Sequence, residues 1–194
     1  MKKLISLLLV FAMMAAMAVG CAAKPAETTE PVPEVIVPAS SLEILETIWA
    51  LYGEDEMFFA MGGDFNNPVD NAPGNYSLED VEMFSYQLYV PAEQVASVDE
   101  AASLIHAMNT NTFTCGAFHM AEGADVNAFA TAIRDNVQSA QWMCGFPEKL
   151  IVAVIGGEYV LMAFGINDAM NPFAEKLTAA YPDAVIAYSE EITG

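Results

Sequence analysis

One apolar hairpin constrains the fold of this chain more than any other segment. Two apolar runs in residues 149–166 flank the pair Gly156 and Gly157. Successive glycines supply the positive φ angles that a type I′ turn requires. Because both runs are apolar at nearly every position instead of alternating with polar residues, both faces of the two strands should be buried. The sequence therefore predicts two central strands with other elements packed on each side.

Helices and further strands are predicted around this hairpin. Amphipathic periodicity predicts helices with one apolar face over residues 40–53, 124–145 and 167–182. Residues 54–77 are predicted to form a Gly-, Asn- and Pro-rich loop, with a short buried strand or helical turn at Met57–Met61, and a short helix is predicted from Ser77 or Asp80 through Met83. The other segments are predicted to form a strand at 83–91, a two-part helix at 91–109, a strand at 111–123 and an edge strand at 183–189. This order predicts a single α+β domain in which helices pack on a mixed or antiparallel sheet.

The first twenty residues have the pattern of a lipoprotein signal peptide. Lys2 and Lys3 precede the apolar run Leu4–Val19, which is too short for a permanent membrane span. The run ends in Ala18–Cys21, and this small-residue pattern before a cysteine is similar to the bacterial lipobox. We therefore expect residues 1–20 to be removed and the thiol of Cys21 to carry a lipid anchor. The alternative is a plain secreted protein in which this cysteine has no such role.

A proline-rich segment separates the leader from the domain. Residues 21–41 contain four prolines and no aromatic residue, which favours an extended tether. In the polyproline II form this tether would span at most about 60 Å. An alternative is that Val35–Val37 forms a first strand of the sheet. We place the folded domain at residues 42–194.

The domain is strongly acidic, and this charge excludes some classes of partner. Residues 42–194 contain 23 acidic residues and three basic ones. Without a basic surface the domain cannot neutralise phosphates, so nucleic acid is excluded and direct docking on anionic lipid is disfavoured. Two interpretations remain open for the acidity, namely solubility outside the cell and attraction of cations or basic peptides.

Two cysteines, Cys115 and Cys144, remain in the domain if Cys21 is lipidated. They could form a disulfide, or they could be two buried free thiols. Cys115 and His119 share one face of a predicted strand, but four residues along a strand span about 13 Å. That distance is too long for a catalytic cysteine–histidine pair.

The segment Asp64–Asp70 is the best candidate for cation binding or hydrolysis. Its Asp and Asn side chains offer hard oxygen ligands, but the spacing fails the EF-hand pattern. No nucleophile elbow, phosphate loop or dinucleotide fingerprint occurs anywhere in the chain. We therefore predict no catalytic residue, no metal ligand and no cofactor, and we favour a non-enzymatic role without excluding an enzyme.

Aromatic residues mark the corner between the predicted helix 124–145 and the hairpin. Trp142 and Phe146 lie there beside a glycine and a proline. They could pack beneath a tight corner, or they could form an exposed patch for a partner.

The lipobox, the proline-rich tether and the stretch from Trp142 to Gly165 together resemble a group of small lipoproteins of Gram-positive gut anaerobes. These chains are treated as domains of unknown function and sometimes loosely labelled bacteriocin transport accessory proteins. The resemblance implies attachment outside the cell and brings no catalytic residues. We expect a lipid-anchored protein on the extracytoplasmic face of the cell membrane that binds or assists an envelope protein or transporter. The alternative is a surface hydrolase or divalent-cation-binding domain that uses Asp64–Asp70.

Overall fold

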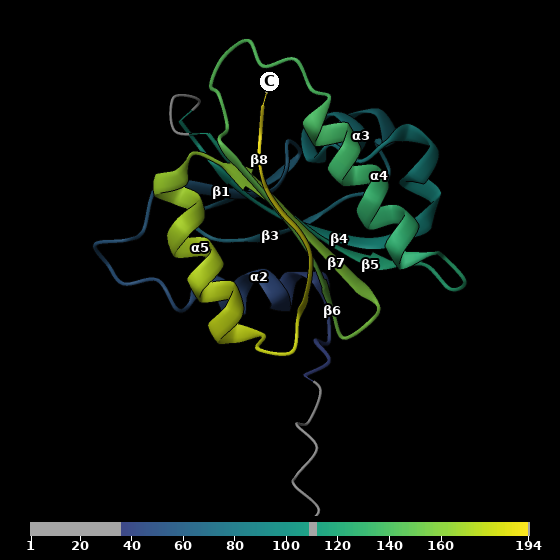
Figure 1. Cartoon of the computed structure of the whole chain (residues 1–194), viewed down its shortest axis with the longest axis horizontal. Coiled ribbons are helices and arrows are strands. Elements are labelled where there is room, and N and C mark those ends of the chain that lie inside the picture. Colours follow the sequence, from purple (N-terminus) through teal and green to yellow (C-terminus); the bar gives the residue numbers. More distant parts are fainter. Residues whose placement is uncertain (1–35, 109–111, 194) are drawn as a thin grey trace, which may run out of the picture. The chain divides into compact units, whose positions relative to one another are not determined.

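The computed structural model describes residues 36–108 and 112–193, and it confirms an α+β domain with an antiparallel sheet (Figure 1). Eight strands pair in the order β2-β1-β4-β5-β7-β6-β8, and β3 pairs with β4 beside β1. The strands are β1 (Ala60–Asp64), β2 (Asn67–Asp70), β3 (Gly74–Tyr76), β4 (Val98–His106), β5 (Phe113–Met120), β6 (Lys149–Ile155), β7 (Tyr159–Gly165) and β8 (Val185–Glu191). The helices are α2 (Ser41–Trp49), α3 (Val81–Leu88), α4 (Val126–Gln138) and α5 (Asn167–Ala180), with a 3₁₀ turn at Ala92–Ser97.

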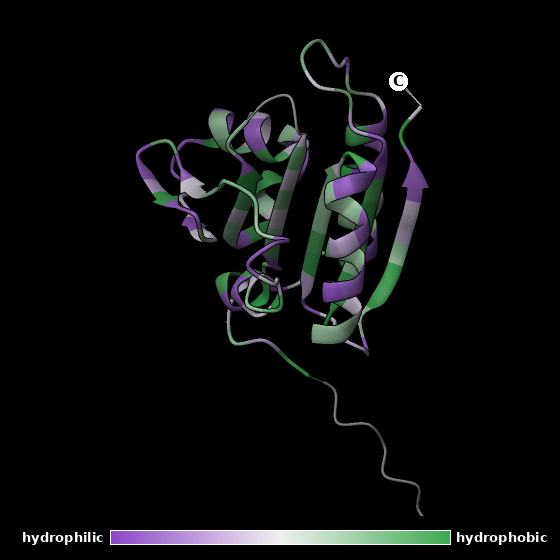
Figure 2. Cartoon of the chain, turned by 90° about the vertical axis from the view of Figure 1, so that its left-hand side faces the viewer, coloured by the Kyte–Doolittle hydropathy of each residue, from purple (hydrophilic) through white to green (hydrophobic). Residues whose placement is uncertain are grey.

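Helices cover both faces of the sheet, as the apolar hairpin predicted. α2 and α5 pack on one face, where the buried cluster includes Ile48, Phe113 and Phe173. α3 and α4 pack on the other face, over a cluster that includes Phe84 and Phe129. Figure 2 shows the consequence, because the central strands are hydrophobic while the outward sides of the helices are hydrophilic. Every residue of β7 is buried.

The central hairpin forms where the sequence placed it. Gly156 and Gly157 both have positive φ, at 59° and 79°. Ile155 pairs with Tyr159, so the connecting loop has three residues instead of the two of a simple type I′ turn. β8 pairs with β6 and forms the edge of the sheet, which confirms the predicted edge strand.

Local capping explains where the predicted helices begin. The Ser40 side chain accepts a hydrogen bond from the Glu43 amide at the start of α2, and Asp125 accepts two amide bonds at the start of α4. α5 instead uses Glu148, whose carboxylate accepts the Asn167 amide at 2.7 Å. α4 ends at Gln138, several residues before the predicted end at 145. The ten residues that follow form a loop, and Gly145 lies within it at φ 81°.

The predicted strand at 83–91 is wrong, because α3 occupies most of this segment. Asp80 begins the helix by accepting the Met83 amide at 3.0 Å. Phe84 and Leu88, four residues apart, are fully buried on one helical face. That spacing matches the helical period better than the alternation of a strand, so the aromatic content was a misleading signal.

The predicted two-part helix at 91–109 is also wrong over most of its length. Residues 98–106 form β4, which pairs with β1, β3 and β5. Alanine favours helices in isolation, but here Ala101 and Ala102 face opposite sides of a covered sheet. Their small side chains let the helices approach the sheet closely, so tertiary packing overrides local propensity.

The segment 54–77, predicted as a loop apart from Met57–Met61, contains three short strands, and β1 overlaps the short strand that was one alternative for Met57–Met61. β1 and β2 form a hairpin across Asp64 and Asn67, and β3 lies beside them. Gly62 is required at this crossing, because a Cβ atom there would lie 2.2 Å from the Gly74 nitrogen. The many Gly, Asn and Pro residues therefore mark tight packing of short strands.

The chain contacts the domain slightly before the predicted boundary at residue 42. The Ile36 amide donates to Asp183 at 2.9 Å, and residues 36–40 have no strand pairing. The predicted leader, most of the tether and Cys21 lie outside the described residues. Within residues 36–108 and 112–193, no helix is both long and apolar enough to cross a membrane.

Candidate binding site: an aromatic cleft at the far end of the sheet

The two ends of the sheet differ in what surrounds them. We call the end near the 156–158 turn the entry end, because the first described residues of the chain lie against it. A Cβ atom added to Gly156 would lie 3.4 Å from Pro38 and Val37. The opposite end, which we call the far end, carries His106, Phe113 and Lys149 at the ends of their strands. Seven residues of β6 separate the two ends by about 20 Å. Figure 1 shows this separation, with the purple segment that leads into α2 below the sheet and the green loop between α4 and β6 above it.

A cleft of about 470 Å³ opens at the far end, and we call it the aromatic cleft. It lies between α3, the ends of β4, β5 and β7, and the loop after α4. Nine of its fourteen lining residues are aromatic or apolar, and polar and apolar atoms make up similar shares of the open surface, so the cleft combines apolar contact with hydrogen-bonding groups. The lining residues are Tyr86, Gln87, Tyr89, Ile105, His106, Met108, Thr112, Phe113, Thr114, Gln141, Trp142, Met143, Cys144 and Phe164.

Three aromatic rings in tilted and edge-to-face contact form one wall of the aromatic cleft. Trp142 contacts Tyr89 and Phe164 with ring centroids 5.4 and 5.2 Å apart. Tyr89 ends α3 in the left-handed region at φ 56°, a conformation that costs a non-glycine residue about 1–2 kcal/mol. Burial raises the pKa of the Tyr89 phenol, and the neighbouring Tyr86 adds to that rise. Packing of the three rings therefore holds the wall in place and offsets the cost of the unfavourable backbone angle at Tyr89.

Two buried polar atoms in this lining lack a hydrogen-bond partner within the described part of the chain. They are the indole nitrogen of Trp142 and the hydroxyl oxygen of Thr112. An unsatisfied buried polar group costs about 1–3 kcal/mol. The indole N–H is a donor only, so a ligand that satisfies it must offer an acceptor such as a peptide carbonyl.

His106 adds one polarised group to the aromatic cleft. Its Nδ1 accepts the Met108 amide at 3.0 Å, and its ring stacks on Phe58 with centroids 4.8 Å apart. Burial lowers the pKa of this imidazole, so the ring is neutral at neutral pH. With Nδ1 occupied as an acceptor, the proton of the neutral ring lies on Nε2.

Large apolar side chains stand exposed around the aromatic cleft. Met143 is 88% exposed, Tyr86 76% and Phe146 68%. Of the two predicted patch residues, Trp142 is half-buried in the wall while Phe146 projects from the same loop. The sequence did not indicate Tyr89 or Phe164 as partners of Trp142. The Phe84–Leu88 spacing, which identifies α3, could have placed Tyr89 at the end of that helix.

The two domain cysteines are free thiols in the structure. Cys115 is fully buried in β5, and burial strongly raises the pKa of its thiol. Cys144 is exposed in the loop after α4, so only one of the pair fits the expectation of buried thiols. His119 shares the strand with Cys115 as predicted, but it pairs with Asp99 at the protein surface.

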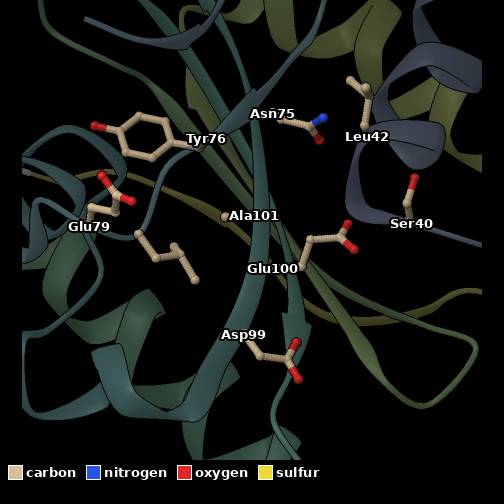
Figure 3. A pocket seen from close by; sticks show the side chains of 9 residues that line it. Ser40, Leu42, Asn75, Tyr76, Glu79, Asp99, Glu100 and Ala101 are labelled. Carbon is tan, nitrogen blue, oxygen red and sulfur yellow. The ribbon is translucent and has the colours of Figure 1, made fainter. Parts of the chain in front are cut away.

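A second hollow, of about 670 Å³, lies between α2 and the β3–β4 pair and is shown in Figure 3. It contains Glu79, Asp99 and Glu100 among its lining residues. Figure 3 shows Glu79 on the opposite side of the β4 ribbon from Glu100, so these acids do not converge. Glu100 accepts the Ser41 amide and Asp99 pairs with His119. These carboxylates therefore serve the local structure.

In the predicted cation segment Asp64–Asp70, the carboxylate of Asp64 is engaged in local hydrogen bonds. Burial alone would raise the pKa of Asp64, but amide hydrogen bonds from Asn66, Ser77 and Asn67 outweigh it and lower the pKa. Strand register places Asp64 three residue pairs from Asp70, or about 10 Å. Within residues 36–108 and 112–193, no three His, Cys, Asp or Glu side chains gather in a group that could hold a metal ion.

Comparisons with known proteins assign no function to this site. No protein-family model, no curated protein and no solved structure matches this chain.

Proposed function

We propose that this protein is a lipid-anchored extracytoplasmic binding protein, non-enzymatic, whose aromatic cleft receives an envelope protein, a transporter or a ligand that one of these handles. The observation that carries the proposal is the aromatic cleft at the end of the sheet opposite residues 36–40. In a chain anchored through Cys21, the polypeptide from the anchor would join the domain at the end of the sheet opposite this cleft. The predicted lipoprotein family is consistent with such an arrangement.

The chemistry of the aromatic cleft favours binding over catalysis. Its lining supplies aromatic surface, one neutral imidazole and two unpartnered polar atoms. None of the described residues that line it carries a carboxylate. The exposed apolar rim is the kind of surface that marks interaction sites in soluble proteins.

The hydrolase or divalent-cation alternative receives little support from this geometry. The carboxylate of Asp64 already accepts amide hydrogen bonds from residues 66, 67 and 77. A calcium titration tests this alternative directly. A rise in melting temperature on adding millimolar Ca²⁺, reversed by a chelator, would support a cation site.

Site-specific photocrosslinking in intact cells tests the proposed function. A photoreactive amino acid at position 143, which is 88% exposed on the rim, should crosslink to a discrete partner. The control position is Glu158, an exposed residue in the entry-end turn. The same product from both positions, or none from position 143, would contradict a binding role for the aromatic cleft.

The anchor is tested separately by the substitution Cys21→Ala. We expect the variant to leave the membrane fraction or to accumulate as an unprocessed precursor, with the acyl mass absent from its N-terminus. An unchanged mass and unchanged membrane partition would rule out the lipid anchor.

A further inference from the structure

The aromatic cleft is the middle part of a longer surface at the far end. It shares Gln87, Ile105 and His106 with a hollow on the β1–β2 hairpin. It shares Trp142 with another hollow that reaches Phe146 and Glu191. We call the combined surface the far-end band. It crosses the ends of six strands from β1 to β8, and five inter-strand steps correspond to about 24 Å.

Apolar side chains project along the whole far-end band. Phe65 is 68% exposed on the β1–β2 hairpin, and Met61 is 38% exposed beside it. Met143 and Phe146 project at the β8 side. Methionine is flexible and polarisable, so such a surface can adapt to different apolar faces.

Both ends of the far-end band are acidic. Asp70 lines the hollow on the β1–β2 hairpin, and Glu148 and Glu191 line the hollow beside β8. None of the described residues that line the three hollows is Lys or Arg. Of the three basic residues in the domain, Arg134 binds Glu190 and Lys176 binds Glu56. Lys149 is the strand partner of Glu191 at the far end, but its ammonium group donates to Asn171 at 3.5 Å and it does not line any of the three hollows.

From this distribution we infer that the far-end band binds a cationic amphipathic peptide segment. Its apolar face would lie on the aromatic cleft, and its Lys or Arg side chains would face Asp70 and Glu191. A length of 24 Å corresponds to a helix of about 16 residues. The inference rests on the proposed function and names the chemical class of its partner.

Electrostatics distinguishes this occupant from the others. The chain carries a formal net charge of −20, so a second copy, an anionic lipid surface and a nucleic acid would all be repelled. For a cationic amphipathic segment, burial of its apolar face and attraction between opposite charges both favour binding. Binding should therefore weaken as salt rises.

The test uses the mature lipidated protein in phosphatidylcholine nanodiscs, with empty nanodiscs as the blank. Three fluorescently labelled peptides of about 18 residues share one Leu face and carry Lys, Gln or Glu on the other. Binding is measured by fluorescence anisotropy. We expect the Leu/Lys peptide to bind at least about tenfold tighter than the Leu/Gln peptide, and the Leu/Glu peptide to bind weakest.

Charge-reversal variants show whether the far-end band is responsible. Asp70→Lys combined with Glu191→Lys should weaken the Leu/Lys peptide about tenfold or more. Glu122→Lys combined with Glu158→Lys makes the same charge change at the entry end and is the matched control. Equal losses in both pairs would show nonspecific attraction and overturn the inference.

The apolar part of the far-end band has its own variant. Met143→Ser changes a side chain that is 88% exposed, so the fold should survive, and binding of the Leu/Lys peptide should fall several-fold. If all three peptides bind alike and all are weakened by Met143→Ser, the cationic preference is wrong while the binding function stands. Absence of Leu/Lys binding would overturn the inference, leaving the crosslinking experiment to judge the proposed function.

Discussion

The two ends of the sheet differ in how far their polar groups are paired, although Asp183 at the entry end also keeps one buried carboxylate oxygen without a partner among the described residues. At the entry end, Glu100 accepts the Ser41 amide and Asp99 pairs with His119. At the far end, the Trp142 indole nitrogen and the Thr112 hydroxyl are buried without a partner in the described part of the chain. Polar groups that satisfy one another hold a fold together. Groups that stay unsatisfied are available to a ligand, and two of them lie in the lining of the aromatic cleft.

The largest expected effect separates the wall of the aromatic cleft from its rim. Phe164→Ala should lower the free energy of unfolding by about 3–5 kcal/mol, because Phe164 is 1% exposed and its removal leaves a cavity. Phe146→Ala, from the 68% exposed rim, should change it by less than about 0.5 kcal/mol. Urea denaturation measures both. A large loss from Phe146→Ala would mean that the rim belongs to the core.

A smaller effect is expected at the entry end. Glu100→Ala should cost about 1–3 kcal/mol, because it removes the acceptor of the part-buried Ser41 amide. Glu100→Gln keeps an acceptor oxygen and should cost less, as thermal unfolding monitored by circular dichroism would show. Equal stability of all three proteins would show that this end is not held by its polar contacts.

The two tryptophans provide the sharpest version of the comparison. Trp49 donates its indole N–H to the Asn71 carbonyl at 3.2 Å, whereas Trp142 has no partner among the described residues. Trp49→Phe should therefore cost about 1–2 kcal/mol. Trp142→Phe also removes a donor, but the relief of an unsatisfied group should keep its cost below about 1 kcal/mol. A larger loss from Trp142→Phe than from Trp49→Phe, in the same denaturation assay, would contradict the assignment of a free donor.

The smallest expected effect depends on pH. The pKa of His106 is lowered by burial, so the unfolded chain takes up a proton more readily than the folded one. His106 therefore contributes full stability above about pH 6.5, and this contribution is lost as the pH falls towards the folded-state pKa. His106→Phe should flatten the decline in melting temperature between about pH 7 and 5. An unchanged slope would show that His106 does not titrate in this range.

Sequence patterns predicted those parts of the fold whose local and tertiary preferences agree. The apolar hairpin around Gly156 and the start of the helix that Asp125 caps form as expected, although the hairpin loop is one residue longer and the helix ends earlier, at Gln138. The predictions for the segments that form α3 and β4 were wrong, for opposite reasons. In α3 the aromatic content predicted a strand, although the Phe84–Leu88 spacing indicates a helix. In β4 the alanines predicted a helix, although the segment forms a central strand.

The candidate site was only partly predictable. Trp142 and Phe146 stood out because aromatic residues beside a glycine and a proline mark a corner. Tyr89 and Phe164 could not be assigned to the same wall, because their contact depends on the position of α3 over β7. The lipid anchor at Cys21 and the lipoprotein family remain predictions.

The edge strand β8 has a consequence for how the protein is made. β6 is almost entirely buried, but on one side its backbone pairs only with β8. Synthesis proceeds from the N-terminus, so that apolar edge stays open until residues 185–191 have emerged. In a chain that ends before Val185, the backbone of β6 would be unpaired on one side and free to pair with a strand of another molecule. We expect such truncated products to aggregate. The acidic end of β8, at Glu190 and Glu191, then makes the finished edge a poor template for further pairing.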